Sequence, residues 1–236
     1  MILAYLFSQL TTDQAPAAGG KGRTLARLYQ AGYRVPNGFV LLPVAFVGDE
    51  LKREAWDQAQ VQLARLRRDT QDISFAVRSS ALDEDSAHAS FAGEFETVLD
   101  VSTDDAIRAA IHAVRCSRSA ERVQTYRQAQ GLASVEPEMA VIIQQVTGER
   151  YGDYLYPAVS GVAQSHNFYP IPPMKREDGI AYIALGLGKT VVEGERALRF
   201  SPRHPTSMPQ FSTVDDILSN AQRYFYALKI RSYPED

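Results

Sequence analysis

Short apolar runs bounded by small polar clusters set the hydrophobic pattern of this 236-residue chain. Period-two alternation and compact apolar runs predict strands, whereas apolar residues three and four apart predict helices. The predicted strands cover residues 2–7, 39–42, 73–77, 95–101, 139–146, 160–166 and 179–185. The predicted helices cover residues 23–31, 43–68, 106–114, 119–130 and 213 to about 228. Val61 is expected to face inward on the second helix, and Thr103 is expected to cap the third. Residues 151–156 are expected to form a tyrosine-rich connection. Because strands and helices do not alternate strictly, the pattern favours an α+β fold.

Residues 73–101 form a segment whose pattern is compatible with an anion-binding loop between two strands. A predicted apolar strand, 73–77, is followed by Arg78, then by a loop of small and acidic residues, 79–86, and a return strand, 95–101. An arginine fork matches phosphate oxygens, and a glycine such as Gly93 lets backbone N–H groups approach an anion closely. The segment therefore suits a phosphate chain. Taken by itself, the local pattern favours the alternative, a β-hairpin with a long surface loop in which Arg78 forms an ion pair with Asp83, Glu84 or Asp85.

A second cation lies where a predicted helix begins. Residues 11–20 form a small-residue linker that ends in Gly19-Gly20-Lys21-Gly22, and the helical spacing starts at Arg23. Gly32 is a typical C-terminal stop for this helix. A lysine is unfavourable at a helix N-terminus unless an anion lies between them. Lys21 is thus a candidate anion ligand.

Composition narrows the class of protein. Hydrophobic residues make up 45% and charged residues 22%, as in ordinary globular proteins. The net charge of −3 gives no clustered positive field for nucleic acid or a membrane surface. One cysteine, Cys116, excludes an internal disulfide and fits a reducing compartment. No apolar run reaches membrane-spanning length, so the expected location is the cytoplasm.

Two familiar motifs are excluded by spacing. Gly188-Lys189-Thr190 lacks the glycine that a P-loop requires five residues earlier, where Ile183 stands. The four histidines are scattered, and no pair has metal-ligand spacing.

Several short blocks occur in a characteristic order along the chain. They are Gly19-Gly20-Lys21-Gly22, Val35-Pro36-Asn37-Gly38-Phe39, Ala76-Val77-Arg78-Ser79-Ser80-Ala81, Ala89-Ser90-Phe91-Ala92-Gly93, Met139-Ala140-Val141 with Gln144, Ser160-Gly161-Val162-Ala163, and Gly186-Leu187-Gly188. Together they resemble the N-terminal nucleotide-binding domain of the phosphoenolpyruvate synthase and pyruvate phosphate dikinase family, over residues 18–196.

The resemblance implies a two-lobed ATP-grasp fold that holds ATP between an N-terminal lobe, residues 1–105, and a C-terminal lobe, residues 106–236. The residues that it assigns to ATP share one cleft. Lys21 and Arg78 hold the phosphates and are the catalytic residues, Ser90, Ala92 and Gly93 belong to the loop that covers the phosphates, Gln144, Gln145 and Val146 border adenine, and Arg196 falls near a family arginine.

In that family, ATP phosphorylates a histidine on a separate carrier domain, which delivers the group to pyruvate on a third domain. The resemblance therefore implies a phosphohistidine domain and a pyruvate-binding domain in a longer polypeptide, neither of which lies in these 236 residues.

The metal positions depart from the family pattern. Mg²⁺ normally completes such a site, and Glu193 is the best candidate ligand. However, no carboxylate stands at the expected place near Ala181, and Lys189 replaces the usual glutamate. Three alternatives stay open: Glu193 and Glu195 hold the metal, Lys189 replaces part of its charge, or catalysis is weakened. The rival hypotheses for function are a degenerate nucleotide-sensing or interaction module without phosphoryl transfer, and a domain that cannot close on ATP without its neighbours.

Overall fold

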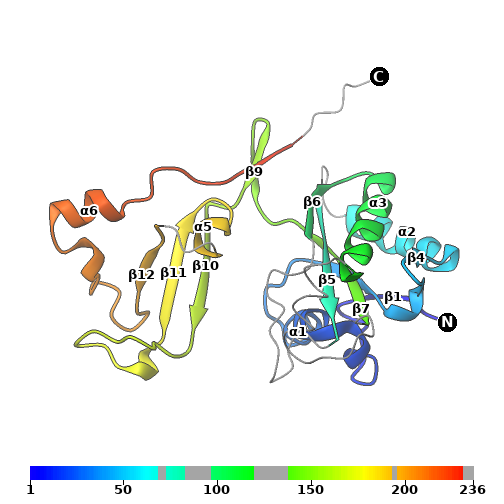
Figure 1. Ribbon diagram of the computed structural model, residues 1–236, viewed down its shortest axis with the longest axis horizontal. Helices are drawn as coiled ribbons and strands as arrows, with labels where there is room; N and C mark the ends of the chain where they lie inside the picture. The colour runs from blue at the N-terminus through cyan, green and yellow to red at the C-terminus, as the bar shows by residue number, and fades with distance from the viewer. Residues whose placement is uncertain (69–72, 83–96, 120–137, 193–195, 231–236) are drawn as a thin grey trace. The chain divides into compact units, whose positions relative to one another are not determined.

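The computed structural model describes residues 1–68, 73–82, 97–119, 138–192 and 196–230. Its contacts divide the chain into an N-terminal unit, Met1–Val146, and a C-terminal unit, Thr147–Asp236 (Figure 1). The functional lobe boundary after residue 105 stays a prediction. Across the described ranges, no helix is both long and apolar enough to span a bilayer.

The N-terminal unit is built on a five-stranded sheet whose neighbouring strands are all antiparallel. Its order is β1 (Ala4–Leu6), β2 (Gly38–Leu41), β7 (Met139–Gln145), β5 (Phe75–Ala81) and β6 (Thr97–Val101). All five predicted strands of this part of the chain are present. The central strand β7 comes from the C-terminal end of the unit. Its pairing with β2 and β5 therefore joins segments that are far apart in the sequence.

Helices α2 (Arg53–Arg68) and α3 (Asp104–Cys116) supply the main core on one face of this sheet (Figure 1). Phe75 and Val77 of β5 are fully buried in that core. The predicted cap of α3 is confirmed: Thr103 Oγ1 accepts the backbone N–H of Ala106 at 3.2 Å. The predicted inward position of Val61 is wrong, because its side chain is 52% exposed.

The helix predicted to begin at residue 43 begins only at Arg53. The intervening residues form a 3-10 turn η2 (Pro43–Ala45) and a hairpin of β3 (Phe46–Val47) and β4 (Glu50–Leu51). Gly48 has a φ of +60° and makes the hairpin turn.

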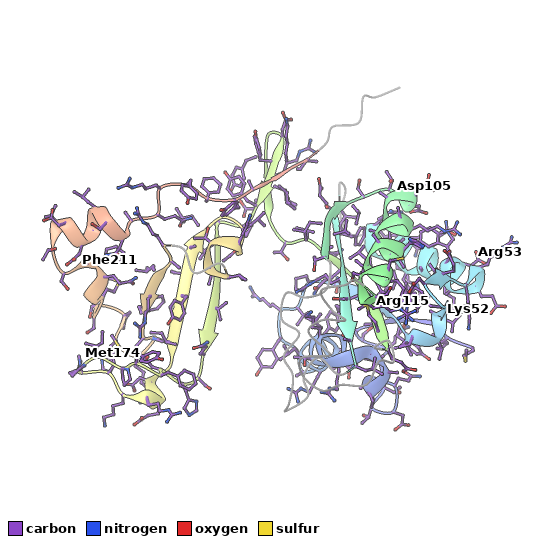
Figure 2. The ribbon with its side chains drawn as sticks, viewed as in Figure 1. Lys52, Arg53, Asp105, Arg115, Met174 and Phe211 are labelled. Carbon is purple, nitrogen blue, oxygen red and sulfur yellow. The ribbon has the colours of Figure 1, made fainter. Side chains whose placement is uncertain are left out.

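Arg115 of α3, which Figure 2 labels, connects the hairpin to the sheet. The guanidinium group donates to the carbonyl of Met139 and, at 3.3 Å, to that of Gly48. It also lies 4.7 Å from the ring centroid of Phe46. A buried charge therefore satisfies two backbone carbonyls that no apolar side chain could pair.

The opposite sheet face packs against the 3-10 turn η1 (Ala15–Ala18) and helix α1 (Gly19–Gln30). Val40 and Ile142 of the sheet and Ala18 and Ala26 of the helical segment are buried together there. Helix α1 starts four residues earlier than predicted, at Gly19. It ends where predicted, before Gly32, whose φ is +83°.

The C-terminal unit contains two small antiparallel sheets. One comprises β10 (Val159–Gln164), β11 (Ile180–Leu185) and β12 (Leu198–Phe200), and the other β8 (Glu149–Tyr151), β9 (Tyr154–Tyr156) and β13 (Leu228–Lys229). The helical segments are η4 (Arg176–Asp178), α5 (Lys189–Val192), η5 (Pro209–Phe211) and α6 (Val214–Asn220). Antiparallel sheets and separate helices confirm the predicted α+β class.

Two predictions for this unit need correction. The tyrosine-rich connection is the β8–β9 hairpin, which turns at Gly152 with a φ of +60°. The last helix begins at the predicted cap, Thr213, but ends at Asn220 rather than near residue 228. Strand β13 follows it instead, because Leu228 pairs with Leu155 of β9.

Candidate functional site

Arg78 lies inside strand β5 rather than at its end. The residues predicted as the start of a loop, Ser79–Ala81, continue the strand and pair with Val141, Ala140 and Met139 of β7. Pairing with β7 satisfies their backbone groups and extends the strand past the point where the apolar pattern stops. The sequence shows only the apolar part of this strand.

The register fixes which candidate residues share a face. Arg78 pairs with Ile142 of β7 and Thr97 of β6, and Ala76 pairs with Gln144. Because alternate strand residues point to opposite faces, these side chains lie opposite the α2–α3 core, on the face that α1 packs against. Arg78 and Gln144 therefore project from the same face of the sheet.

Ser80 attaches the beginning of α1 to this face. Its hydroxyl donates to the carbonyl of Ala18 at 2.7 Å and accepts the backbone N–H of Gly22 at 3.0 Å. The contact needs glycine nearby: a Cβ on Gly19 would lie 2.4 Å from the carbonyl oxygen of Ser80, and Gly19 has a φ of +71°. Lys21 lies between these anchored residues, in the first turn of α1.

The structure thus brings Lys21 and Arg78 to the same face of the sheet. The link is the hydrogen bond between Ser80 of β5 and Gly22 of α1, which are 58 residues apart in the sequence. Both side chains are half-buried. Among the described residues, Arg78 has no hydrogen bond or ion pair. The alternative pairing with Asp83, Glu84 or Asp85 falls outside the described residues. Ser80 was not a predicted site residue, and only its position in the Arg-Ser-Ser block directly after Arg78 could have indicated it.

The three residues predicted to border adenine separate in the structure. Gln144 is buried and donates from Nε2 to the carbonyl of Pro36 at 3.1 Å, on the Arg78 side. Gln145 turns to the opposite face, where Nε2 lies 3.4 Å from the carbonyl of Leu66 in α2. The backbone N–H of Val146 donates to Ser74. Gln144 therefore shares a face with Arg78, and Gln145 does not.

Four predicted residues, Ser90, Ala92, Gly93 and Glu193, lie outside the described residues, as does Glu195. Arg196 is described and belongs to the C-terminal unit, where it lines a pocket with Thr190.

The altered metal positions also lie in the C-terminal unit. Ala181 of β11 is buried and pairs with Ala163 and Phe200, so no carboxylate replaces it on the neighbouring strands. Lys189 Nζ lies 4.7 Å from the ring centroid of Tyr226. In the part of the chain that the structure describes, no three His, Cys, Asp or Glu side chains are grouped to hold a metal.

Comparison with known proteins gives a consistent set of relatives. A family model described as "Pyruvate phosphate dikinase, AMP/ATP-binding domain" matches residues 44–207. The chain is 29% identical to the uncharacterized phosphotransferase YvkC of Bacillus subtilis, over 80% of this chain and 24% of the relative. It is 28% identical to phosphoenolpyruvate synthase of Escherichia coli, over 81% and 28%. It is 33% identical to a rifampicin phosphotransferase of a Streptomyces species, over 59% and 20%. The chain thus spans about a quarter of the length of these relatives.

Proposed function

Because the chain belongs to the pyruvate phosphate dikinase AMP/ATP-binding domain family, we propose that it is the ATP-binding part of a phosphotransferase similar to phosphoenolpyruvate synthase. In this proposal the chain has the two-lobed ATP-grasp fold and passes a phosphoryl group from ATP to a histidine. That histidine belongs to a carrier domain outside these residues, and a pyruvate-binding domain receives the group afterwards.

The observation that carries the proposal is the shared face of Lys21 and Arg78. Phosphoryl transfer depends on positioning and charge neutralisation more than on covalent help from the protein. A rigid strand presents the guanidinium of Arg78, and Ser80 holds the helix that presents Lys21. The N-terminus of α1 adds a dipole that favours negative charge. These features suit the phosphates of ATP.

Remaining roles follow from the same assignment. Gln144 borders the adenine, the loop containing Ser90, Ala92 and Gly93 covers the phosphates, and Arg196 completes the nucleotide contacts from the C-terminal unit. Mg²⁺, held by Glu193, neutralises further phosphate charge.

Calorimetric titration with ATP tests the phosphate assignment. We expect Arg78→Ala and Lys21→Ala each to weaken ATP binding by about 30-fold, since a hydrogen bond to a charged group contributes about 2 kcal/mol. Arg53→Ala is the matched control, because Arg53 is exposed on α2, beside the opposite sheet face (Figure 2). It should bind ATP within about twofold of wild type. Wild-type affinity in both Lys21→Ala and Arg78→Ala would remove the assignment.

A second function, nucleotide sensing without phosphoryl transfer, has one specific observation in its favour. Among the described residues, no three His, Cys, Asp or Glu side chains are grouped to hold a metal, and β11 around Ala181 contains no carboxylate. Repeating the titration with Mg²⁺ and with a chelator separates the two functions. ATP affinity that rises with Mg²⁺ supports the phosphotransferase, whereas affinity independent of Mg²⁺ supports the sensing module.

A further inference from the structure

The C-terminal unit contains a small pocket at one end of a sheet, where β11 begins and β12 ends. Its lining includes Tyr169, Ile171, Met174 and Phe200, together with Arg199 and Gln210. Figure 2 labels Met174 in the long connection between β10 and β11. All of these residues belong to the C-terminal unit, and none of them has a role in the proposed nucleotide site.

The pocket has the size of a single side chain. Its volume is about 90 Å³, whereas small-molecule sites generally exceed about 300 Å³. Large apolar side chains lie around it, since Tyr169 is 79% exposed and its neighbour Phe168 is 62% exposed. An exposed apolar cluster that borders polar residues is typical of a surface that binds another chain. The size and the exposure together indicate a docking pocket for one side chain of a partner.

The loop that forms one wall of the pocket is held in place before any partner binds. The side chain of buried Asn167 accepts the backbone N–H of Tyr169 at 3.1 Å, and its own backbone N–H donates to the carbonyl of Arg176 at 2.8 Å. The N–H of Met174 donates to the carbonyl of Ile171 at 2.9 Å. A wall that is already ordered loses little conformational entropy on binding, and this favours association.

Arg199 of β12 connects this loop to the sheet. Nη2 of its guanidinium group donates to Oδ1 of Asn167 at 3.3 Å and to the carbonyl of Tyr169 at 3.0 Å. Its backbone N–H donates to Oε1 of Gln210 at 2.8 Å, which fixes the strand on the other side. Both side-chain contacts use the same nitrogen, and among the described residues Arg199 forms no ion pair. The rest of the guanidinium group can therefore bind a carboxylate at the edge of the pocket.

The surroundings of the pocket carry more positive than negative charge. The cations of the surrounding segments, 165–178 and 198–210, are Lys175, Arg176, Arg199 and Arg203. The acids of the same segments are Glu177 and Asp178. Asp178 is already paired, since it lies 3.3 Å from His204 and 3.7 Å from Arg203. This charge favours an acidic partner.

We propose that this pocket docks a peptide segment in which a large aliphatic side chain, such as leucine, lies beside an acidic residue. The aliphatic side chain fills the pocket against Ile171, Met174 and Phe200. Tyr169 covers it, and the neighbouring carboxylate pairs with Arg199. A membrane surface would also meet the exposed aromatic and basic residues, but it would not fill a concave pocket of this size. A peptide therefore fits the site better than a membrane does.

Blocked pentapeptides test the docking of such a segment. The probe has a central leucine between two aspartates, with a serine at each end. One control peptide replaces the leucine by alanine, and the other replaces both aspartates by asparagine. Titration of the whole isotope-labelled chain, followed by NMR, should shift the backbone amides of Tyr169, Met174 and Arg199. We expect each control peptide to bind about tenfold more weakly than the probe.

Two substitutions separate the apolar contact from the charged one. Tyr169→Ala keeps the backbone groups that hold the loop and should weaken the probe about fivefold. Arg199→Gln should weaken the probe about tenfold but leave the asparagine peptide unchanged, because only the probe has a carboxylate to lose. Tyr154→Ala and Arg150→Gln, exposed on the β8–β9 hairpin outside the pocket, are the matched controls and should change the affinity less than about twofold.

Three results would overturn the proposal. The first is the absence of amide shifts around the pocket at millimolar probe, and the second is wild-type affinity for the probe in both Tyr169→Ala and Arg199→Gln. The third is sedimentation with vesicles of phosphatidylcholine and phosphatidylserine that Tyr169→Ala abolishes, without binding of the probe, which would assign the exposed residues to a membrane surface. Because no ATP is added, these results do not depend on the proposed nucleotide function.

Discussion

The two units of this chain are stabilised by different kinds of contact. The large side chains that are almost fully buried, among them Phe39, Phe75, Ile107 and Ile143, all lie in the N-terminal unit, as do both core clusters of the described residues. In the C-terminal unit the buried apolar residues are Ile180 and small alanines. Its buried residues also include Asn167, Asp178, Thr190 and Ser201, which are polar.

The difference suggests that the N-terminal unit provides a rigid site and the C-terminal unit opens more easily. A sheet covered on both faces holds Arg78 and the start of α1 in fixed positions, which suits a site that depends on preorganised charge. A unit held mainly by hydrogen bonds opens at lower free energy, as regions with few apolar contacts generally do. Four predictions test or refine this comparison.

The largest expected effect comes from a matched pair of core substitutions. Ile143 of β7 and Ile180 of β11 are both buried in strands, but only Ile143 belongs to a core cluster. We expect Ile143→Ala to lower the free energy of unfolding of its unit by about 4 kcal/mol, and Ile180→Ala by about 2 kcal/mol, since a thin core collapses around the lost volume. Peptide-resolved hydrogen exchange measures each unit separately. Equal losses would contradict the comparison.

Arg115 is a buried charged residue of the N-terminal unit, and its replacement tests how much such a charge contributes to stability. Arg115→Met removes the donors to Met139 and Gly48, so we expect a loss of about 3 kcal/mol in urea unfolding. Arg108→Met, on the exposed side of the same helix over Trp56, is the control and should cost less than about 1 kcal/mol. Similar values for both variants would show that the hydrogen bonds of Arg115 to Met139 and Gly48 contribute little to stability.

Ser80 links stability to the proposed site. Ser80→Ala leaves the N–H of Gly22 and the carbonyl of Ala18 without their partner, so we expect a loss of about 2 kcal/mol and a severalfold weaker ATP affinity. Ser79→Ala is the control, because Ser79 is equally buried on the opposite face of β5. An unchanged ATP affinity in Ser80→Ala would mean that the anchor does not position Lys21.

The smallest effect concerns acid sensitivity of the C-terminal unit. The Asp178 carboxylate accepts the N–H of Lys175 at 2.7 Å and lies 3.3 Å from His204 Nε2 and 3.7 Å from Arg203. These contacts, the backbone hydrogen bond first, hold the pKa of Asp178 below its ordinary value. The ionised Asp178 therefore contributes its full share to the free energy of unfolding above the ordinary Asp pKa of about 4. This contribution is lost as pH falls below that value.

Asp178→Asn should reduce the acid-induced loss of protection that hydrogen exchange detects in the C-terminal unit between pH 5 and pH 3. The N-terminal unit serves as the internal reference, because the three partners of Asp178 named above all belong to the C-terminal unit. An unchanged pH profile in the variant would show that other groups account for the acid sensitivity.

The sequence by itself determined most secondary structure and the family. Period-two apolar runs located the seven predicted strands, Thr103 located the start of α3, and Gly32 located the end of α1. These features depend on residues that are neighbours in the chain, so their signals are local. Local signals of the same kind placed Lys21 near the start of a helix and Arg78 directly after an apolar run.

Only the tertiary structure decided which of these residues meet. Ser79–Ala81 became strand because β7 pairs with them, and Ser80 then reached Ala18 and Gly22. Gln144 reached the carbonyl of Pro36 on one face of the sheet, and Gln145 reached that of Leu66 in α2 on the other. Thr190 and Arg223 line one pocket although 33 positions separate them. Such contacts depend on long-range pairing and packing, and a local pattern of apolar and polar residues does not encode them.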